Sequence, residues 1–408
     1  MDTDVLIIGA GPAGSVAAQM LNRLGHKIVI LESQQFPRFS IGESLLPQCM
    51  AFLEAADMLD AVGAENFQFK NGAAFSHAGK LTEFDFRQKF TPGWGTTFQV
   101  PRGRFDQVLA DTAERSGVTV HYRHKIVGAD FQMPGQARLT SVDADGITRE
   151  WTARMVLDAS GFGRVLPRLL DLETPSSLPA RQALFTHIED RITTENYDRD
   201  KILIAIHPEH HHIWYWLIPF GNGRSSLGVV LPQGFLDARQ GSPLEILRGL
   251  AFEEPRLAEL LANSCFDTPA NQIGGYSANV SRLAGDGFAL LGNAGEFLDP
   301  VFSSGVTIAL KSAALAAPLV DKQLRGQTVD WQTDYEHALR KGIEVFRAYV
   351  EAWYDGRFQR IIFEPSQLVS VKAMVCSILA GYAWDETNPM TQRCGKRIAA
   401  IADICPPL

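Results

Sequence analysis

The stretch DVLIIGAGPAG, residues 4–14, decides the fold of this chain. Its apolar run from Asp4 to Ile8 predicts a buried strand, and residues 13–24 have the spacing of a helix. A second apolar run, residues 27–31, predicts the next strand. The glycines between the first strand and the helix form a G-x-G-x-x-G motif, which permits a tight turn and lets the backbone approach a pyrophosphate at the helix N-terminus. The order strand, turn, helix, strand therefore predicts a dinucleotide-binding α/β unit.

An acidic residue stands where such a unit holds a ribose. Glu32 ends the second predicted strand, 21 residues after Gly11, and its carboxylate can accept hydrogen bonds from ribose hydroxyls. A carboxylate there disfavours a 2′-phosphate, so FAD or NAD is expected rather than NADP. The predicted cofactor contacts in this part of the chain are Gly9, Gly11, Ala13, Gly14 and Glu32. The alternative is a tight turn that binds no ligand.

Composition and charge narrow the function classes. The chain has 408 residues, which at roughly 150 residues per domain allows two or three units, and its net charge is −8. This acidic balance lacks the electrostatic footprint of a nucleic-acid binder. No membrane span is expected, because no apolar stretch approaches the roughly 18 residues that a bilayer requires. The acidic start, Met1 to Asp4, lacks the positive charge of a secretory signal, so a cytoplasmic location is expected.

Neither the cysteines nor the histidines predict a metal site. The five cysteines are odd in number and far apart, and none belongs to a C-x-x-C pair, so reduced structural thiols are expected. His207, His210, His211 and His212 gather beside a proline in a predicted loop, without Asp or Cys at ligand spacing. We interpret them as surface or structural histidines.

The rest of the chain divides by character. β-rich segments dominate between about residues 178 and 271, residues 289–291 restore the pattern of a buried strand, and the chain after residue 326 is helical and rich in aromatic residues. This predicts a discontinuous nucleotide-binding domain (1–75, 100–177 and 272–325), a β-rich substrate-binding domain (76–99 and 178–271) and a helical C-terminal region (326–408).

Four further segments carry a family resemblance: residues 36–47 (FPRFSIGESLLP), residues 104–106 (RFD), residues 158–161 (DASG) and residues 292–300 (GNAGEFLDP). In this order they resemble the FAD-contact motifs of the FAD-dependent aromatic hydroxylase and monooxygenase superfamily, and more narrowly its flavin-dependent, tryptophan-halogenase-like branch. The resemblance runs from residue 1 to about residue 320. It implies FAD as the cofactor. It also implies an α/β fold in which a Rossmann-type FAD-binding domain carries an inserted mixed-sheet substrate domain and a helical C-terminal region.

The resemblance implies a second set of cofactor contacts. They are Ser44, Arg104, Asp158, Gly161, Asn293, Pro300, Gly305 and Val306. The family's usual acid in the G-D flavin motif is Asn293 here, which keeps a hydrogen-bonding side chain but removes a charge. Backbone amides near Gly305 and Val306 are expected to stabilise negative charge at the N1–C2=O edge of the flavin, as a helix N-terminus can.

Two motifs and one lysine indicate the halogenase branch. Residues 214–219 (WYWLIP) match its W-x-W-x-I-P signature, and residues 297–305 (FLDPVFSSG) resemble the loop that passes over the flavin in that family. Lys70 stands where these enzymes place a lysine that holds or polarises hypohalous acid. The resemblance therefore implies Lys70, Trp214, Trp216 and Ser304 as catalytic residues.

Each of these features also has a plainer interpretation. Trp214 and Trp216 share one face of a predicted strand, where they can wall a passage near the flavin ring or simply be two core tryptophans. A lone lysine in a polar loop, such as Lys70, is usually a solvated surface charge.

The activity that the resemblance implies is oxygen-dependent. Reduced FAD and O₂ would form a flavin C4a-hydroperoxide, and halide would become hypohalous acid that halogenates a phenol, pyrrole or indole group. Only one nucleotide fingerprint is present, so a separate flavin reductase or a visiting NAD(P)H is expected to supply the electrons. Phe302 stands where indole-type halogenases carry a glutamate. That pattern is closer to the phenol and pyrrole halogenases, whose substrates are often tethered to a carrier protein.

Three alternatives stay open at this point. Related FAD monooxygenases hydroxylate an aromatic group, including a tryptophan side chain on a partner protein or a carrier-bound substrate. A flavin reductase or dehydrogenase on the same scaffold needs no oxygen chemistry. A scaffold or maturation partner that keeps FAD only for folding would be no enzyme at all.

Overall fold

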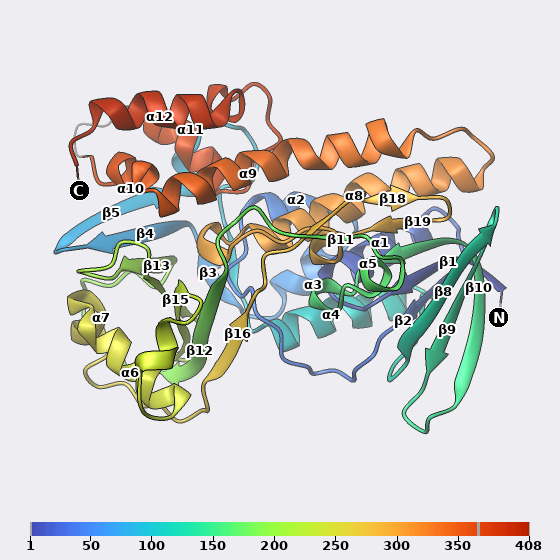
Figure 1. Ribbon diagram of the computed structural model, residues 1–408, viewed down its shortest axis with the longest axis horizontal. Coiled ribbons are helices and arrows are strands. Elements are labelled where there is room, and N and C mark those ends of the chain that lie inside the picture. Colours follow the sequence, from blue (N-terminus) through green and yellow to red (C-terminus); the bar gives the residue numbers. More distant parts are fainter. Residues whose placement is uncertain (1, 365–367, 408) are drawn as a thin grey trace.

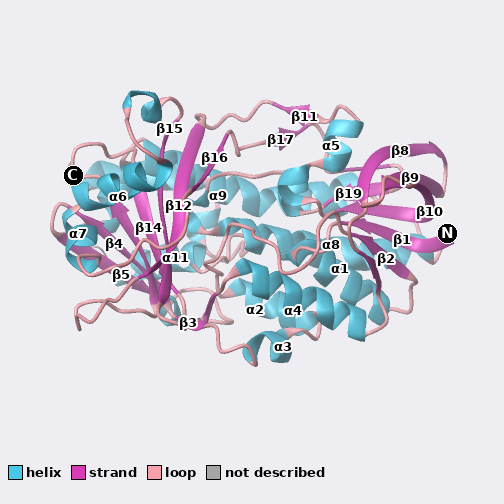
Figure 2. Cartoon of the chain, turned by 90° about the horizontal axis from the view of Figure 1, so that it is seen from below, coloured by secondary structure: helices cyan, strands magenta, loops and turns pink. Residues whose placement is uncertain are grey.

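Two β-sheets stand at opposite ends of the molecule, and helices fill the space between them (Figures 1 and 2). The computed structural model describes residues 2–364 and 368–407. In this described part, the larger sheet has eight strands, the other has seven, and two further pairs of short strands join outlying segments. The predicted fold class is confirmed: the chain is α/β with several sheets and a helical C-terminal region.

The eight-stranded sheet is built around the N-terminal strand. β1 (Asp2–Ile8) pairs in parallel with β2 (Ile28–Leu31) on one side and with β10 (Thr148–Asp158) on the other. Central parallel strands are covered on both faces, which explains why residues 5–8 are continuously apolar and buried. The main path runs β18-β19-β10-β1-β2-β7, while β9 pairs with β10 and β8 with β9. The other strands are β7 (Thr119–His121), β8 (Lys125–Met133), β9 (Gln136–Val142), β18 (Ala284–Gly285) and β19 (Phe288–Leu290).

Helices pack beside this sheet and occupy the middle of the molecule (Figure 2). α1 (Pro12–Arg23) follows β1 directly, as the glycine motif predicts, and packs against α8 (Ser304–Leu324). The other helices of this region are α2 (Gln48–Ala55), α3 (Leu59–Gly63), α4 (Arg102–Arg115) and α5 (Val165–Leu169).

α8 corrects one expectation. By length and composition it is long and apolar enough to cross a membrane, although no such stretch was expected from the sequence. In the fold, 61% of its most apolar window is buried, and it packs between α1 and the C-terminal helix α9 (Ala338–Tyr354). Its apolar character is accounted for by its position as a core helix.

The seven-stranded sheet runs β16-β12-β15-β14-β13-β4-β5. α6 (Pro243–Glu253) and α7 (Pro255–Leu260) cover its outer face, and its inner face is turned toward the middle of the molecule. β4 pairs with β13 from Gly72 onward, so residues 72–75, which the predicted boundary assigned to the nucleotide-binding domain, belong to this sheet. Its strands are β4 (Gly72–His77), β5 (Lys80–Asp85), β12 (Arg181–Glu189), β13 (Lys201–Ile206), β14 (Trp214–Pro219), β15 (Arg224–Pro232) and β16 (Asn271–Gly274).

The remaining elements link and brace the two sheets. β3 (Gln68–Lys70) pairs with β6 (Thr97–Gln99), and β11 (Glu173–Thr174) pairs with β17 (Asn279–Val280). In the C-terminal region a π-helical segment, Trp331–His337, leads into α9, which runs beside α8 (Figure 1). The helices that follow are α10 (Arg357–Ile362), α11 (Val369–Leu379) and α12 (Cys394–Ile404).

Candidate functional site

A cavity of about 560 Å³ lies where the parallel strands of the eight-stranded sheet end. Ile8 and Leu31 mark the ends of β1 and β2 on one side, and β14 forms an aromatic wall on the other. The carboxyl ends of parallel strands are the usual place for a ligand in an open α/β sheet. The predicted site residues that line this cavity are Gly9, Gly11, Ala13, Glu32, Ser44, Gly161, Trp214, Trp216, Asn293, Pro300, Gly305 and Val306.

Glu32 is held in place by backbone donors at the end of β2. Its Oε2 accepts a hydrogen bond from the backbone N–H of Ala10 at 2.8 Å, and its Oε1 accepts one from Gln34 at 2.9 Å. The guanidinium of Arg38, which is not among the predicted site residues, lines the cavity 3.7 Å from the same carboxylate. The hydrogen bond from Ala10 fixes the glycine turn relative to the Glu32 carboxylate.

Asn293 places an unpaired hydrogen-bond acceptor in the cavity wall. Its side chain lines the cavity, and its Oδ1 is buried without a hydrogen-bond partner among the described residues. Buried polar atoms are nearly always paired, so this acceptor is expected to bond to a bound molecule. At the first turn of α8, the residues Gly305 and Val306 line the same cavity, and a helix start leaves backbone N–H groups for an anion or a carbonyl oxygen. With the glycine turn and Glu32, these groups fit FAD.

Five predicted site residues do not line this cavity: Gly14, Lys70, Arg104, Asp158 and Ser304. Arg104 points away from it, because its guanidinium pairs with Glu65 at the surface of the protein. Two positions earlier, Arg102 does line the cavity. It donates to the carbonyl of Ile41 at 2.6 Å and to Asp106 at 2.7 Å. Both arginines belong to one motif region, and only the face of α4 decides which of them points inward.

Asp158 supports the backbone around the site instead of facing the cavity. Its carboxylate accepts from the backbone N–H of Ser160 at 2.9 Å and of Leu166 at 2.6 Å. Burial raises the pKa of this carboxyl group. The side chain thus fixes the turn after β10, where Gly161 lines the cavity.

Lys70 is fully buried behind the cavity wall. Its Nζ donates to the hydroxyl of Ser44 at 2.6 Å and to the carbonyl of Leu45 at 2.8 Å, and it lies 5.4 Å from the ring centre of Phe86. Ser44 itself lines the cavity, so the amine stands one hydrogen bond away from it. Burial lowers the pKa of Lys70 to about 7 and outweighs the opposing effect of the neighbouring Cys49. This burial is inconsistent with a solvated surface lysine.

The burial of Lys70 predicts a pH-dependent stability difference. Its pKa falls from 10.5 in the unfolded chain to about 7 in the fold, so the fold binds fewer protons between these pH values. The free-energy cost of burying the ammonium is therefore complete below pH 7 and shrinks as the pH rises toward 10.5. We expect Lys70→Met to stabilise the protein more at pH 6 than at pH 9, as measured by urea unfolding. Equal gains at both pH values would contradict a depressed pKa.

Trp214 and Trp216 wall the cavity from the seven-stranded sheet. Their ring centres lie 6.0 Å apart on one face of β14, as the sequence spacing predicts. The indole of Trp216 lies flat over β15, where a Cβ on Gly228 would come within 2.2 Å of it. The Trp216 Nε1 donates to Ser226 at 3.0 Å, which fixes the ring.

Trp214 belongs to a buried hydrogen-bond chain that reaches the loop over the cavity. Its Nε1 donates to the hydroxyl of Tyr354 at 3.0 Å, and that hydroxyl donates to Asp299 at 2.8 Å. Asp299 directly precedes the cavity-lining Pro300, and burial raises its pKa to about 6. Tyr354 is the last residue of α9, so these hydrogen bonds connect β14, the loop over the cavity and the C-terminal helices.

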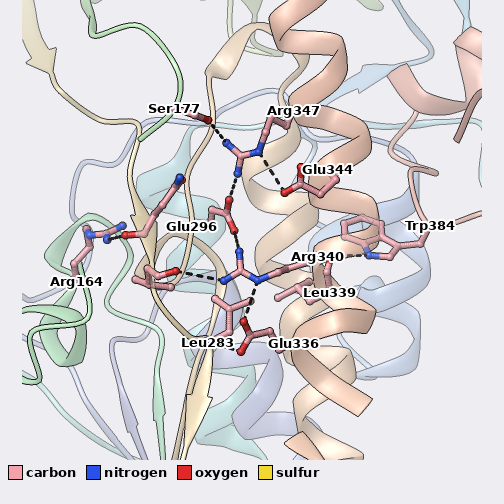
Figure 3. A network of polar contacts seen from close by, with 12 residues as sticks. Arg164, Ser177, Leu283, Glu296, Glu336, Leu339, Arg340, Glu344, Arg347 and Trp384 are labelled. Atoms are coloured by element: carbon pink, nitrogen blue, oxygen red, sulfur yellow. Dashed lines mark hydrogen bonds and ion pairs between the residues drawn. The ribbon is translucent and has the colours of Figure 1, made fainter. Parts of the chain in front are cut away.

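A second polar network fastens α9 to the loop that carries Asn293 (Figure 3). Glu296 is buried between Arg340 and Arg347, and each of these arginines forms an ion pair with it. Arg340 also contacts Glu336, and Arg347 contacts Glu344. Burial raises the pKa of Glu296 although the two arginines oppose this. The carboxylate holds two cations that would otherwise face each other.

This network predicts a large loss of stability on neutralising its centre. In Glu296→Gln the nearly buried Arg347 loses its buried counter-ion, which is expected to cost about 3 kcal/mol of unfolding free energy. The matched control is Glu344→Gln, because Glu344 contacts the same arginine but is 58% exposed, and its loss should cost less than about 1 kcal/mol. Urea unfolding of both variants checks this, and similar losses in the two would contradict a central role for Glu296.

The histidine cluster forms no metal centre in the described residues. Within residues 2–364 and 368–407, no group of three or more His, Cys, Asp or Glu side chains is arranged to hold a metal ion. His207 instead contacts Glu253 at 3.2 Å, and its ring packs beside that of His210.

Comparison with known proteins finds similarity to FAD-binding and flavin-dependent proteins. A family model described as an FAD binding domain matches residues 2–246. The chain is 29% identical to the 1H-pyrrole-2-carbonyl-(peptidyl-carrier protein) chlorinase of Pseudomonas fluorescens, over 86% of this chain and 84% of that protein. It is 30% identical to a flavin-dependent halogenase of Armillaria mellea, over 81% of this chain and 69% of that protein. Among solved structures, a flavoprotein/dehydrogenase from Cytophaga hutchinsonii is 42% identical with a TM-score of 0.96, covering 99% of this chain and 98% of that one.

Proposed function

Because this chain belongs to the flavin-dependent halogenase branch of the FAD-binding-domain family, and is therefore an FAD-dependent oxidoreductase, we propose that it halogenates an electron-rich aromatic ring. The single observation that carries the proposal is the placement of Lys70, a desolvated amine one hydrogen bond from the cavity through Ser44. The paired tryptophans on the opposite wall complete the arrangement.

FAD, once reduced and supplied with O₂, provides the oxidising equivalents for this chemistry. The glycine turn, Glu32 and Asn293 would hold it, and Arg102 would steady the segment that carries Ser44. Trp214 and Trp216 would exclude water and form the apolar face against which a ring lies. Lys70 would pass a proton through the Ser44 hydroxyl to hypohalous acid, because a desolvated ammonium is a strong donor and needs no reorganisation.

The residue at position 302, in the loop over the cavity, supports a proposal for the substrate class. Phe302 is buried there against aromatic rings of the C-terminal helices, including Trp353 and Phe358, so this position supplies no carboxylate. We propose that the group that is halogenated is a phenol or a pyrrole in preference to an indole. A relative of this chain is named as acting on a pyrrole carried by a peptidyl carrier protein, which favours testing a carrier-bound as well as a free substrate.

The test supplies purified enzyme with FAD, a flavin reductase, NADH, O₂ and bromide, and offers phenol, pyrrole and indole probes. We expect brominated products, identified in the mass spectrum by the paired bromine isotopes. Products that gain only oxygen, without dependence on bromide, would show that the enzyme is a hydroxylase and not a halogenase. A substrate oxidised equally well without O₂ would favour a dehydrogenase, the activity named for the solved structure that is 42% identical.

A further inference from the structure

A buried carboxylate that the proposed chemistry leaves unused stands in the cavity wall. Glu43 lies next to Ser44, lines the cavity, and its side chain is 1% exposed. Its Oε1 lies 2.5 Å from Nε2 of His187. Its Oε2 is buried and has no hydrogen-bond partner within residues 2–364 and 368–407. A buried acceptor without a partner is costly, which indicates that a bound molecule faces it.

The strand register places this pair beside the aromatic wall. His187 of β12 is opposite Ser226 of β15, and Ser226 is opposite Ile218 of β14, which lines the cavity. Two positions along, Phe185 stands in the same relation to Trp216. Side chains two residues apart on a strand share a face, so the imidazole belongs to the tryptophan face. The carboxylate therefore borders the space for an aromatic ring.

The pair also connects the cavity with solvent. The His187 side chain is 29% exposed, in contrast to the buried Glu43. Phe39, a half-exposed residue of the cavity wall, stacks on Phe185 with ring centres 5.8 Å apart and lies beside the imidazole. Among the described residues, His187 is the one side chain within hydrogen-bond distance of the Glu43 carboxylate. A proton on the Glu43 carboxylate can therefore reach solvent through the His187 imidazole.

We propose that Glu43 accepts the proton that the aromatic ring loses on halogenation, and that His187 passes it to solvent; this rests on the proposed function. A ring electron pair forms the carbon–halogen bond while the oxygen–halogen bond of hypohalous acid breaks. The departing hydroxide takes a proton from the Ser44 hydroxyl and leaves as water, and the Ser44 oxygen takes a proton from Lys70 in its place. The ring C–H bond then breaks, its electrons restore aromaticity, and its proton moves to Glu43 Oε2. Lys70 regains its proton from solvent.

Glu43→Gln tests the step with FAD-loaded enzyme, a flavin reductase, NADH, O₂ and bromide. The variant should retain FAD, reoxidise reduced flavin and oxidise bromide, measured with monochlorodimedone, within about twofold of the wild type. Bromination of phenol should fall about 10²-fold or more, as expected when a general base is lost. Ring-deuterated phenol should then react more slowly than phenol, because C–H cleavage becomes limiting. Unchanged phenol bromination, or loss of FAD, would overturn the proposal.

Two further variants complete the test. Glu189→Gln is the matched control. Glu189 lies on β12, the strand of His187, but its carboxylate is paired with Arg191 at the surface. The substitution should leave every measurement unchanged. His187→Gln should lower phenol bromination by itself but add little to Glu43→Gln, because a relay acts as one unit. Fully additive losses would contradict a relay. A wild type that oxidises no bromide would overturn the proposed function and, with it, this inference.

Discussion

Lys70→Met is expected to slow halogenation by orders of magnitude while the protein keeps its fold and its flavin. The amine is replaced by an apolar chain of similar length at a fully buried position, so no charge is left unpaired and the core remains filled. Loss of one preorganised donor in a water-excluded site costs about 10²- to 10³-fold in rate. Product analysis with bromide should show this loss while the reduced flavin is still reoxidised by O₂.

The control for this substitution is a partly buried lysine outside the cavity wall. Burial also lowers the pKa of Lys311, but that side chain lies on α8 beside the rings of Phe52 and Trp384. Lys311→Met should keep halogenation close to the wild-type rate. If Lys70→Met retains bromination, the amine has only a structural role behind Ser44.

Gly14→Ala is expected to remove cofactor binding almost completely. A Cβ at position 14 would lie 2.0 Å from the carbonyl oxygen of Gly9, and backbone cannot give way as a flexible side chain can. α1 would have to move away from the turn after β1, and the cradle for a pyrophosphate would be lost with it. The variant should purify without the 450 nm flavin absorbance and should not regain it on incubation with FAD.

The matched control is Gly249→Ala in α6, a helical position where a Cβ would meet no atom within 4 Å. Replacement of a helix-interior glycine by alanine should raise the unfolding free energy by about 0.5–1 kcal/mol and leave flavin binding intact. A yellow Gly14→Ala protein would show that close approach of α1 to β1 is not what the motif requires.

Local patterns predicted the parts of the site that depend on neighbours in sequence. The glycine turn and Glu32 occupy the expected places because strand, turn and helix follow one another within a few residues. The tryptophan pair could be placed on one face because side chains alternate along a strand.

Features that depend on tertiary packing were not predictable in the same way. Arg102 and Arg104 differ only in which side of α4 they occupy, and nothing local says which side meets the cavity. Glu43 belongs to a recognised motif, but its importance rests on His187, which is distant in sequence and joins it only through β12. The apolar α8 could be identified as a core helix only after α1 and α9 were seen against it.

The most direct test of the central claim is a single turnover of FAD-reduced wild-type enzyme mixed with O₂, bromide and phenol. The ratio to be measured is brominated product formed per FAD oxidised. For a halogenase we expect a ratio close to one, with little hydrogen peroxide released. Oxidation of the flavin that yields only hydrogen peroxide or an oxygenated product, at the same ratio with and without bromide, would contradict it.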